Sequence, residues 1–142
     1  MSRLWDKGKR LDEQVLAYTA GEDAVFDNRL VTHDVRASIA HAAMLRDQGY
    51  LEASDFATIE QGLTELGAEH ARGLWQVELA DEDVHTALER RLVERIGPSG
   101  GRVHLGRSRN DQVLAALRLW MKAEVAELAI AARSVARAMT EI

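Results

Sequence analysis

The fold is decided by residues 110–139, NDQVLAALRLWMKAEVAELAIAARSVARAM, which contain neither glycine nor proline and predict one long helix. Apolar residues recur there every three or four positions, on one helical face with a nearly heptad spacing: Leu117, Met121, Val125, Leu128, Ala132, Val135 and Met139. A helix from about Asn110 or Asp111 to about Ala138 would be roughly 40 Å long. A domain of this size cannot cover such a helix, so we expect a bundle that other chains or further sequence complete.

Three shorter amphipathic helices are predicted before this stretch, because apolar residues again fall three or four positions apart. The first ends near Gly49, and its apolar face comprises Val31, Val35, Ile39, Ala42 and Leu45. The second begins with Ser54 as its N-cap and ends at Gly73, and its apolar face comprises Phe56, Ile59, Leu63 and Leu66. The third is stopped by Gly97 and Pro98, and its apolar face comprises Val84, Leu88, Leu92 and Ile96.

The remaining segments carry weaker patterns. Residues 97–108 are predicted as a loop, and residues 74–79, LWQVEL, alternate in a way that favours a short extended piece. In residues 1–26 the pattern is hard to assign, with a short helical stripe of Leu11, Val15 and Tyr18. One extended piece cannot form a sheet, so the predicted fold class is all-α. We expect a small helical N-terminal domain, residues 1–108, followed by the start of a bundle-forming helix, residues 109–142.

The composition argues against several classes of protein. The formal net charge is −5, opposite in sign to a nucleic-acid-binding surface. The sequence has no cysteine, which excludes disulfides, thiolate metal ligands and a cysteine nucleophile. The first residues, MSRLWDKGKRLDEQ, are charged throughout, unlike a signal peptide, and no apolar run is long enough for a membrane span. We therefore expect a cytoplasmic protein with no nucleic-acid or membrane partner.

The segment that leads into the long helix, GRVHLGRSRNDQ, gathers many hydrogen-bonding groups. With the N-cap at Asn110 or Asp111, the first free N–H groups of the helix would face this segment, beside Arg107 and Arg109. Backbone donors, a helix dipole and two guanidinium groups together form a site for a carboxylate or phosphate, to which Ser108 adds a neutral donor. An ordinary helix cap whose arginines pair with nearby acids fits the pattern equally well.

Two other interpretations of the polar residues are weaker. Residues 101–108, GRVHLGRS, match the spacing of a phosphate-binding P-loop with Arg107 in place of lysine, but a P-loop follows a buried strand and this segment follows a helix. His85 and Glu89 lie four positions apart on one predicted helix, with Asp83 close by, but no third or fourth metal ligand is evident. We therefore expect no metal ion and no cofactor.

Four stretches occur in an order that is known from one family of enzymes. They are LW near the start, DNRLVTHDVRASIAHAAML at 27–45, EDVHTALERRLVERIG at 82–97 and RVHLGRSRNDQVLAALRLW at 102–120. Together they resemble the argininosuccinate lyase family, a branch of the fumarase/aspartase superfamily, over nearly all of the chain. The SRNDQ run is fairly specific, because fumarases and adenylosuccinate lyases carry related but different residues there.

The resemblance implies an activity, an assembly and a site. Members of this family split argininosuccinate into arginine and fumarate, the last step of arginine biosynthesis. They are homotetramers whose active sites combine three subunits through a bundle of long helices. By position, the substrate contacts in this chain are expected to be Asn110, Arg109, Ser108, His85, Asp83 and Asp27. Negative charge develops on a substrate carboxylate in the transition state, so preorganised donors around it would supply much of the rate enhancement.

The family's general acid and base have no counterpart in this chain. The resemblance places them in two further segments, one carrying a histidine and one a glycine- and serine-rich loop, and neither occurs in this sequence. The catalytic residues are therefore unknown here. We expect this chain alone to be inactive.

Local departures from the family leave the substrate open. Leu105 stands where the family usually has threonine, and YTAGED at 18–23 lacks a serine that touches substrate in the family. The substrate could therefore be a modified argininosuccinate. One alternative function is another lyase of the superfamily, which acts on fumarate, aspartate or adenylosuccinate. A second alternative is a non-catalytic helical assembly module, which the heptad-like seam favours.

Overall fold

The computed structural model describes residues 14, 15, 18 and 21–141, and within them every regular element is helical. The elements are α2 (Asp23–Asp27), α3 (Val31–Asp47), α4 (Ala53–Ala71), the 3₁₀ helix η1 (Leu79–Asp81), α5 (Val84–Ile96), the 3₁₀ helix η2 (Gly97–His104) and α6 (Arg109–Thr140). The all-α prediction is confirmed. The predictions for Leu11 and for the LW pair near the start lie outside the described residues. None of the helices described is both long and apolar enough to cross a membrane.

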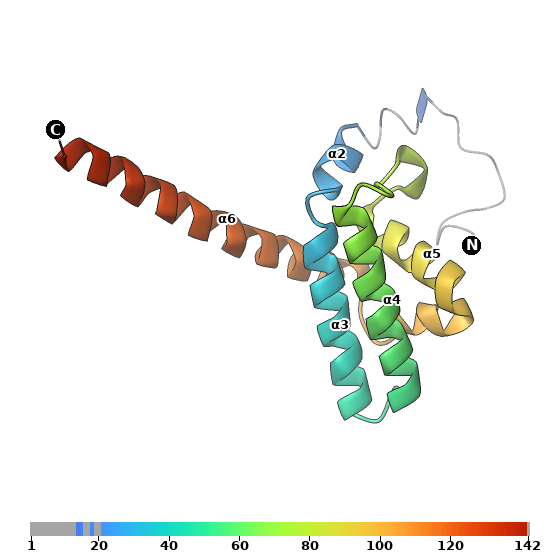
Figure 1. The fold of residues 1–142 in the computed structure, drawn as a ribbon. Helices are drawn as coiled ribbons and strands as arrows, with labels where there is room; N and C mark the ends of the chain where they lie inside the picture. Colours follow the sequence, from blue (N-terminus) through green and yellow to red (C-terminus); the bar gives the residue numbers. More distant parts are fainter. Residues whose placement is uncertain (1–13, 16–17, 19–20, 142) are drawn as a thin grey trace.

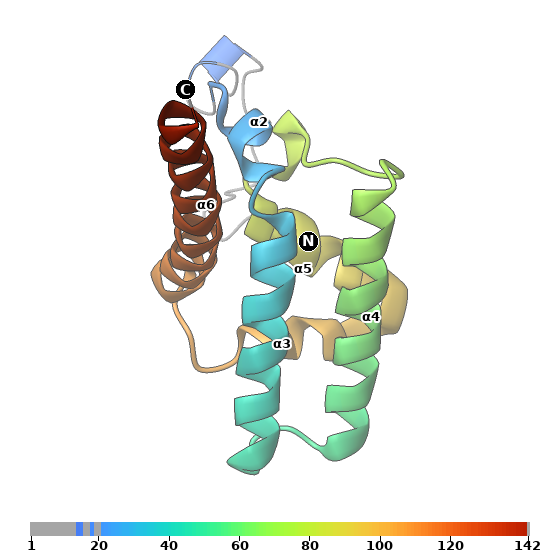
Figure 2. The same ribbon diagram turned by 60° about the vertical axis from the view of Figure 1, so that its left-hand side comes forward.

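Helices α3 and α4 form an antiparallel pair that lies side by side in both ribbon views (Figure 1; Figure 2). Gly49 has a φ of 75° and turns the chain after α3, as predicted. The N-cap prediction for Ser54 is wrong, since α4 begins at Ala53 and its N-cap is Glu52. The buried Leu51 fixes the chain against the core, so that the helix starts directly after Glu52 and already includes Ser54.

The core lies where α5 crosses the α3–α4 pair. The three predicted apolar faces are buried, except that Ile39 and Ile96 are only partly buried at the edge of the core. Gly62 on α4 permits the close approach of α5, because a Cβ atom at this position would lie 2.7 Å from Cδ1 of Leu92. Gly97, at a φ of 76°, ends α5 as predicted.

The prediction of a loop for residues 97–108 is wrong for most of the segment, because η2 covers Gly97–His104. Pro98 lies in the first turn, where its fixed φ suits a helix. Gly100 and Val103 are both buried, in the part of η2 that packs against α5. Contact with the core therefore holds the segment in a short helix that glycine-rich sequence alone does not predict.

The prediction that Asn110 or Asp111 caps the last helix is also wrong. Ser108 is the N-cap: its Oγ accepts from the N–H of Asn110 at 3.1 Å, and Asp111 accepts from the N–H of Ser108 at 2.9 Å. This is a capping box with aspartate in the acidic position, and it moves the first helical residue to Arg109. The helix ends at Thr140, slightly later than predicted.

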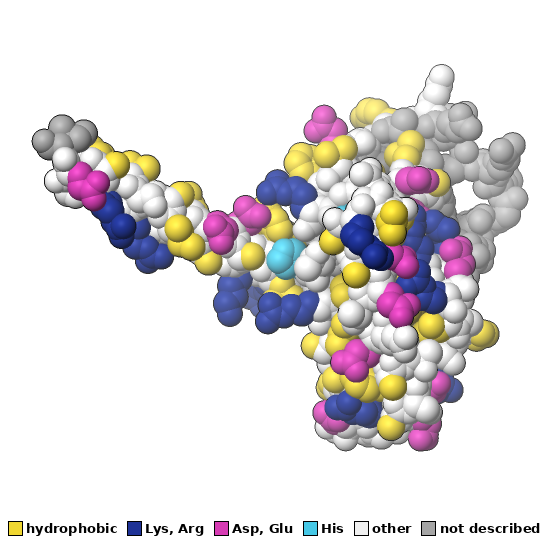
Figure 3. Space-filling model, viewed as in Figure 1, with side chains coloured by type: hydrophobic (Ala, Val, Ile, Leu, Met, Phe, Trp, Pro, Cys, Tyr) yellow, Lys and Arg dark blue, Asp and Glu magenta, His cyan; other side chains and the backbone are white. Residues whose placement is uncertain are grey.

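The first turns of α6 pack against the other described helices, where Gln112 and Ala116 are buried, and Arg29 contacts Trp120 and Glu124 further along. The remainder projects away from the body, with apolar side chains along it (Figure 1; Figure 3). Every described residue from Met121 onward is exposed. The large apolar residues exposed on this helix are Leu114, Met121, Val125, Leu128, Ile130, Val135 and Met139.

Candidate functional site

Two predicted site residues cap the first turn of α5. Asp83 is its N-cap and accepts from the N–H of Thr86 at 2.6 Å, while Asp27 at the end of α2 accepts from the N–H of Val84 at 2.8 Å. Negative groups are stabilising at a helix N-terminus. Burial raises the pKa of the Asp27 carboxyl above its usual value and the charge of Asp83 adds to the rise, whereas the hydrogen bond from Val84 lowers it. Both carboxyl groups therefore have a structural task in this corner of the fold.

A cluster of buried polar side chains joins α3, α5 and α6 beside this turn. Asp34 is fully buried, and its Oδ2 lies 2.8 Å from Nδ1 of His85. Its Oδ1 accepts from the hydroxyl of Ser38 at 3.1 Å, and both of its oxygens lie 3.2 Å from Nε2 of Gln112. His85, one of the expected substrate contacts, is only 2% exposed.

The guanidinium group of Arg109 lies between α6 and the first turns of α5. Its Nη1 donates to Oε1 of Gln112 at 2.8 Å, and its Nη2 to Oγ1 of Thr86 at 3.4 Å. Its ion pairs with Asp83 and Glu89 are long, at 3.8 and 3.7 Å, and exceed hydrogen-bond distance. Because the side chain is also 27% exposed, a ligand anion can compete with these two carboxylates for the guanidinium.

Arg107 directly precedes the N-cap of α6, and its side chain turns toward α3. Its Nη2 donates to Oγ of Ser38 at 3.0 Å, and its Nε is buried without a partner among the residues described. Burial lowers the pKa of this guanidinium, and the charge of Asp34 opposes that change. His41 Nε2 lies 2.8 Å from the carbonyl of Leu105, so the segment before α6 is tied to α3 at two points.

Asn110 differs from the other predicted site residues. Its side chain belongs to an exposed residue and makes no hydrogen bond within the described part of the chain. Ser108 precedes it, and that hydroxyl accepts one bond but still has its own proton to donate. The start of α6 therefore presents an unengaged amide and a hydroxyl, with Arg109 between them in sequence.

The structure brings Asp27, Asp83, His85 and Arg109 together around the start of α5. Ser108 and Asn110 follow at the start of α6. Arg109 offers a partly exposed guanidinium in this corner, and Ser108 and Asn110 offer a hydroxyl and an amide at the exposed start of α6. These are the types of donor that bind carboxylates, while Asp83 and Glu89 compete with any ligand for the guanidinium.

Sequence reasoning missed the buried polar residues behind this corner: Asp34, Ser38 and Gln112. A signal was present, since Asp34 and Ser38 fall three and seven positions after Val31, on the apolar face of their helix. A polar residue on such a face needs a buried partner, and that requirement could have singled them out.

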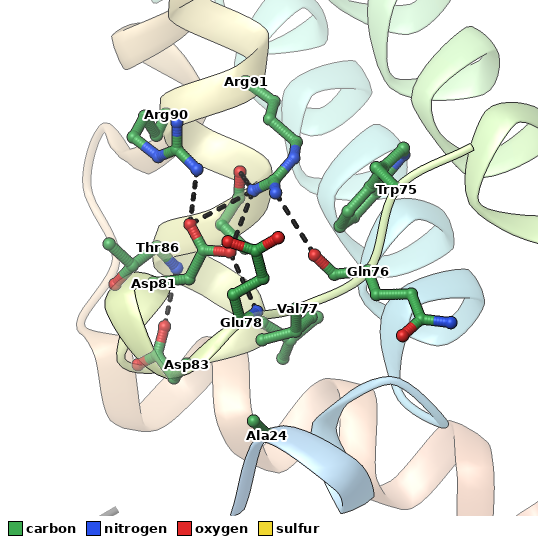
Figure 4. Close-up of polar contacts among 12 residues, drawn as sticks. Ala24, Trp75, Gln76, Val77, Glu78, Asp81, Asp83, Thr86, Arg90 and Arg91 are labelled. Atoms are coloured by element: carbon green, nitrogen blue, oxygen red, sulfur yellow. Dashed lines mark hydrogen bonds and ion pairs between the residues drawn. The ribbon is translucent and has the colours of Figure 1, made fainter. Parts of the chain in front are cut away.

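A second polar cluster surrounds Asp81 at the end of η1. Figure 4 shows Arg90 and Arg91 directed from α5 toward its carboxyl group, which also accepts from the N–H of Glu78 at 3.1 Å. Burial raises the pKa of Asp81, but the bonds from Arg90 and Glu78 and the charge of Arg91 outweigh it and hold the pKa below its usual value.

This cluster precedes a strained turn. Glu82 has a φ of 74° and a ψ of −55°, close to the rare classic γ-turn, which is costly for a residue with a Cβ atom. The anchored Asp81 lies on one side of it and the helix cap Asp83 on the other. The two fixed neighbours thus hold the turn that aims Asp83 at the start of α5.

A surface hollow of about 330 Å³ lies between α4 and α5, and it shares Arg91 with the cluster around Asp81. It is lined by Leu66, Glu69, Leu74, Trp75, Arg91, Glu94 and Arg95. Arg95 is paired with Glu69 at 2.6 Å, and Arg91 stacks on Trp75 with its central carbon 4.4 Å from the ring centre. None of the predicted substrate contacts lines this hollow.

The pair considered above as half of a metal site, His85 and Glu89, has other partners. His85 faces Asp34, and Glu89 is drawn to Arg109. Within the described ranges, no group of three histidine, aspartate or glutamate side chains is placed to hold a metal ion.

Comparison with known proteins identifies the family. Residues 11–141 match the family model described as Lyase. Among curated relatives, the argininosuccinate lyase of Sorangium cellulosum is 44% identical over 140 residues, which cover 99% of this chain and 33% of that protein. Those of Thermotoga neapolitana and Symbiobacterium thermophilum are 43% and 45% identical, each over 89% of this chain and over 32% and 27% of the relative.

The match over residues 11–141 shows that this all-α chain belongs to the Lyase family. The particular relatives that it matches are argininosuccinate lyases, and the chain spans about a third of their length.

Proposed function

We propose that this chain forms the substrate-carboxylate-binding part of an argininosuccinate lyase, which cleaves argininosuccinate to arginine and fumarate. Family membership and the names of the relatives support this assignment. The single observation that carries it is the unengaged side chain of Asn110, next to Arg109 and Ser108 at the start of α6. A planar amide, a guanidinium and a hydroxyl are suited to a carboxylate that gains charge in the transition state.

The proposed substrate contacts are Asn110, Arg109, Ser108, His85, Asp83 and Asp27. Asp27 and Asp83 would act from their positions as caps of α5, and His85 from the buried cluster. The residues that transfer protons would come from segments that this sequence does not contain, so we expect no turnover by this chain alone. We also propose that the reaction belongs to arginine biosynthesis in the cytoplasm.

The assignment is tested in a chimeric lyase, in which this chain replaces the matching region of the Sorangium cellulosum enzyme. We expect the chimeric lyase to release fumarate from argininosuccinate, and this chain alone to release none. Fumarate, aspartate and adenylosuccinate should not be turned over. A properly assembled chimera that ignores argininosuccinate but acts on one of the others would assign the chain to a different lyase.

The exposed apolar side chains of α6 favour a role in assembly as well. We propose that residues 109–142 are a separate unit, which packs with copies of itself in a homotetramer, whereas residues 1–108 form the helical N-terminal domain. Sedimentation of Leu128→Glu should show a smaller species than the unaltered protein. Ala126→Glu adds the same charge on the opposite side of α6 and is the control. A stable helical oligomer that binds no dicarboxylate would favour the alternative of a non-catalytic assembly module.

A further inference from the structure

The Asp34 carboxyl group is the point at which three helices meet. It lies on α3, is 0% exposed, and receives hydrogen bonds from Ser38 on its own helix and Gln112 on α6. His85 on α5 approaches the same group at 2.8 Å. A buried carboxyl is costly unless most of its lone pairs are satisfied, and here each oxygen has two partners.

The network fixes which way the Gln112 amide points. Its Oε1 accepts from Nη1 of Arg109 at 2.8 Å, and a guanidinium group can only donate. The Nε2 group is therefore the one that faces Asp34, with 3.2 Å to each carboxyl oxygen. A continuous relay runs from Asp34 through Gln112 to the guanidinium of Arg109.

The same carboxyl group orients His85. An imidazole ring has two nitrogens, and the partner of one sets the role of the other. Because Nδ1 faces a carboxyl oxygen, the contact favours a proton on Nδ1, and Nε2 is the nitrogen left for any further partner. One buried residue thus sets the direction of two proposed substrate contacts, His85 and Arg109.

We propose that Asp34 is a positioning residue of the lyase site, which fixes the His85 ring through Nδ1 and the Arg109 guanidinium through Gln112. The inference rests on the proposed function, because only a bound substrate gives these two orientations a use. Packing alone does not require a carboxyl group at position 34. A well-packed apolar residue of similar volume often makes a protein as stable as a buried charged group does. Groups that bind a transition state must instead be held to within fractions of an ångström, and buried partners provide that restraint.

The first test needs neither a substitution at Asp34 nor any activity. Long-range ¹H–¹⁵N spectra of this chain distinguish a protonated from a bare ring nitrogen in each of the five histidines. The His85 signals are assigned by their loss in His85→Gln. We expect a protonated Nδ1, with or without a proton on Nε2. A bare Nδ1 with the proton on Nε2 overturns the proposal.

The second test is kinetic and uses the chimeric lyase. Asp34→Asn keeps the shape of the side chain but puts an NH₂ group where one donor needs an acceptor, so the network must rearrange. We expect kcat/KM for argininosuccinate to fall about 10- to 100-fold, the loss typical of a displaced binding group. Ile59→Val is the control, because it weakens the same core without touching the network. It should lower Tm and leave kcat/KM unchanged.

The outcomes separate this inference from the proposed function. A folded Asp34→Asn enzyme with kcat/KM within about twofold of the unaltered enzyme overturns the positioning role. A chimeric lyase that cleaves no argininosuccinate counts against the proposed function, while the ring spectra still decide whether Asp34 orients His85. If Asp34→Asn does not fold, the spectra of the unaltered chain remain the deciding measurement.

Discussion

Gly100 in η2 lies against the backbone of Val93 in α5, so closely that a Cβ atom on Gly100 would be 2.9 Å from the Val93 nitrogen. Backbone atoms cannot move aside as the end of a side chain can, so the contact requires glycine. It also explains why a glycine-rich segment is helical here, since η2 is held in place by its fit to α5.

Gly100→Ala should therefore destabilise the fold by about 1–3 kcal/mol, the usual effect of overpacking. The neighbouring Gly101 is the matched control, because a Cβ atom there meets nothing within 4 Å. Gly101→Ala should be neutral or slightly stabilising, since alanine restricts the unfolded chain. Urea unfolding followed by circular dichroism measures both. Equal free energies of unfolding for the two variants would contradict the close packing.

Ser108→Ala should lower the free energy of unfolding by about 0.5–2 kcal/mol, because it removes the N-cap of α6. Ser54→Ala is the comparison, because Ser54 lies inside the first turn of α4 and the cap there is Glu52. That variant should be neutral, or slightly stabilising through the helix propensity of alanine. A loss at Ser54 as large as that at Ser108 would reinstate the N-cap that the sequence suggested for α4.

Asp81→Asn should destabilise the protein at neutral pH by about 1–3 kcal/mol, because two arginines lose their buried anionic partner and one acceptor oxygen becomes an NH₂ donor. The pKa of Asp81 is lowered in the folded state, so its charge adds stability above its unfolded pKa of about 3.9. That contribution is lost as the pH falls through the folded pKa.

The difference in unfolding free energy between the native protein and Asp81→Asn should therefore shrink below about pH 4. Urea titrations at a series of pH values provide the measurement. Asp55→Asn, which breaks the more exposed pair with Arg102, should change stability by less than about 1 kcal/mol at any pH. A penalty at Asp81 that is independent of pH would show that its charge is not what stabilises the turn.

Asn110→Ala should reduce kcat/KM of the chimeric lyase about 10- to 100-fold, the loss expected for one hydrogen bond to a charged substrate group. Because the side chain is exposed and bonds no described residue, the thermal stability should hardly change. Lys122→Ala, on the exposed part of the same helix, is the control and should leave kinetics and stability as they are. A near-normal value for Asn110→Ala would remove this residue from the site.

The sequence by itself determined the helices, because each depends on local spacing. Apolar residues three or four positions apart placed α3, α4, α5 and α6, and the glycines at 49, 73 and 97 marked where three of them end. The SRNDQ run at 108–112 and the EDVH run at 82–85 directed attention to the starts of α6 and α5, where most of the proposed contacts lie. Family resemblance followed from the same local strings of residues.

Only the tertiary structure decided how those strings meet. The contact of Asp34 with His85 and Gln112 joins positions that are 51 and 78 residues apart, and no local periodicity encodes such a pairing. The turn of Arg107 toward Ser38 and the helical form of η2 likewise depend on surfaces supplied by other helices. Side-chain direction is set by burial and by the satisfaction of buried polar groups, and both are properties of the packed molecule.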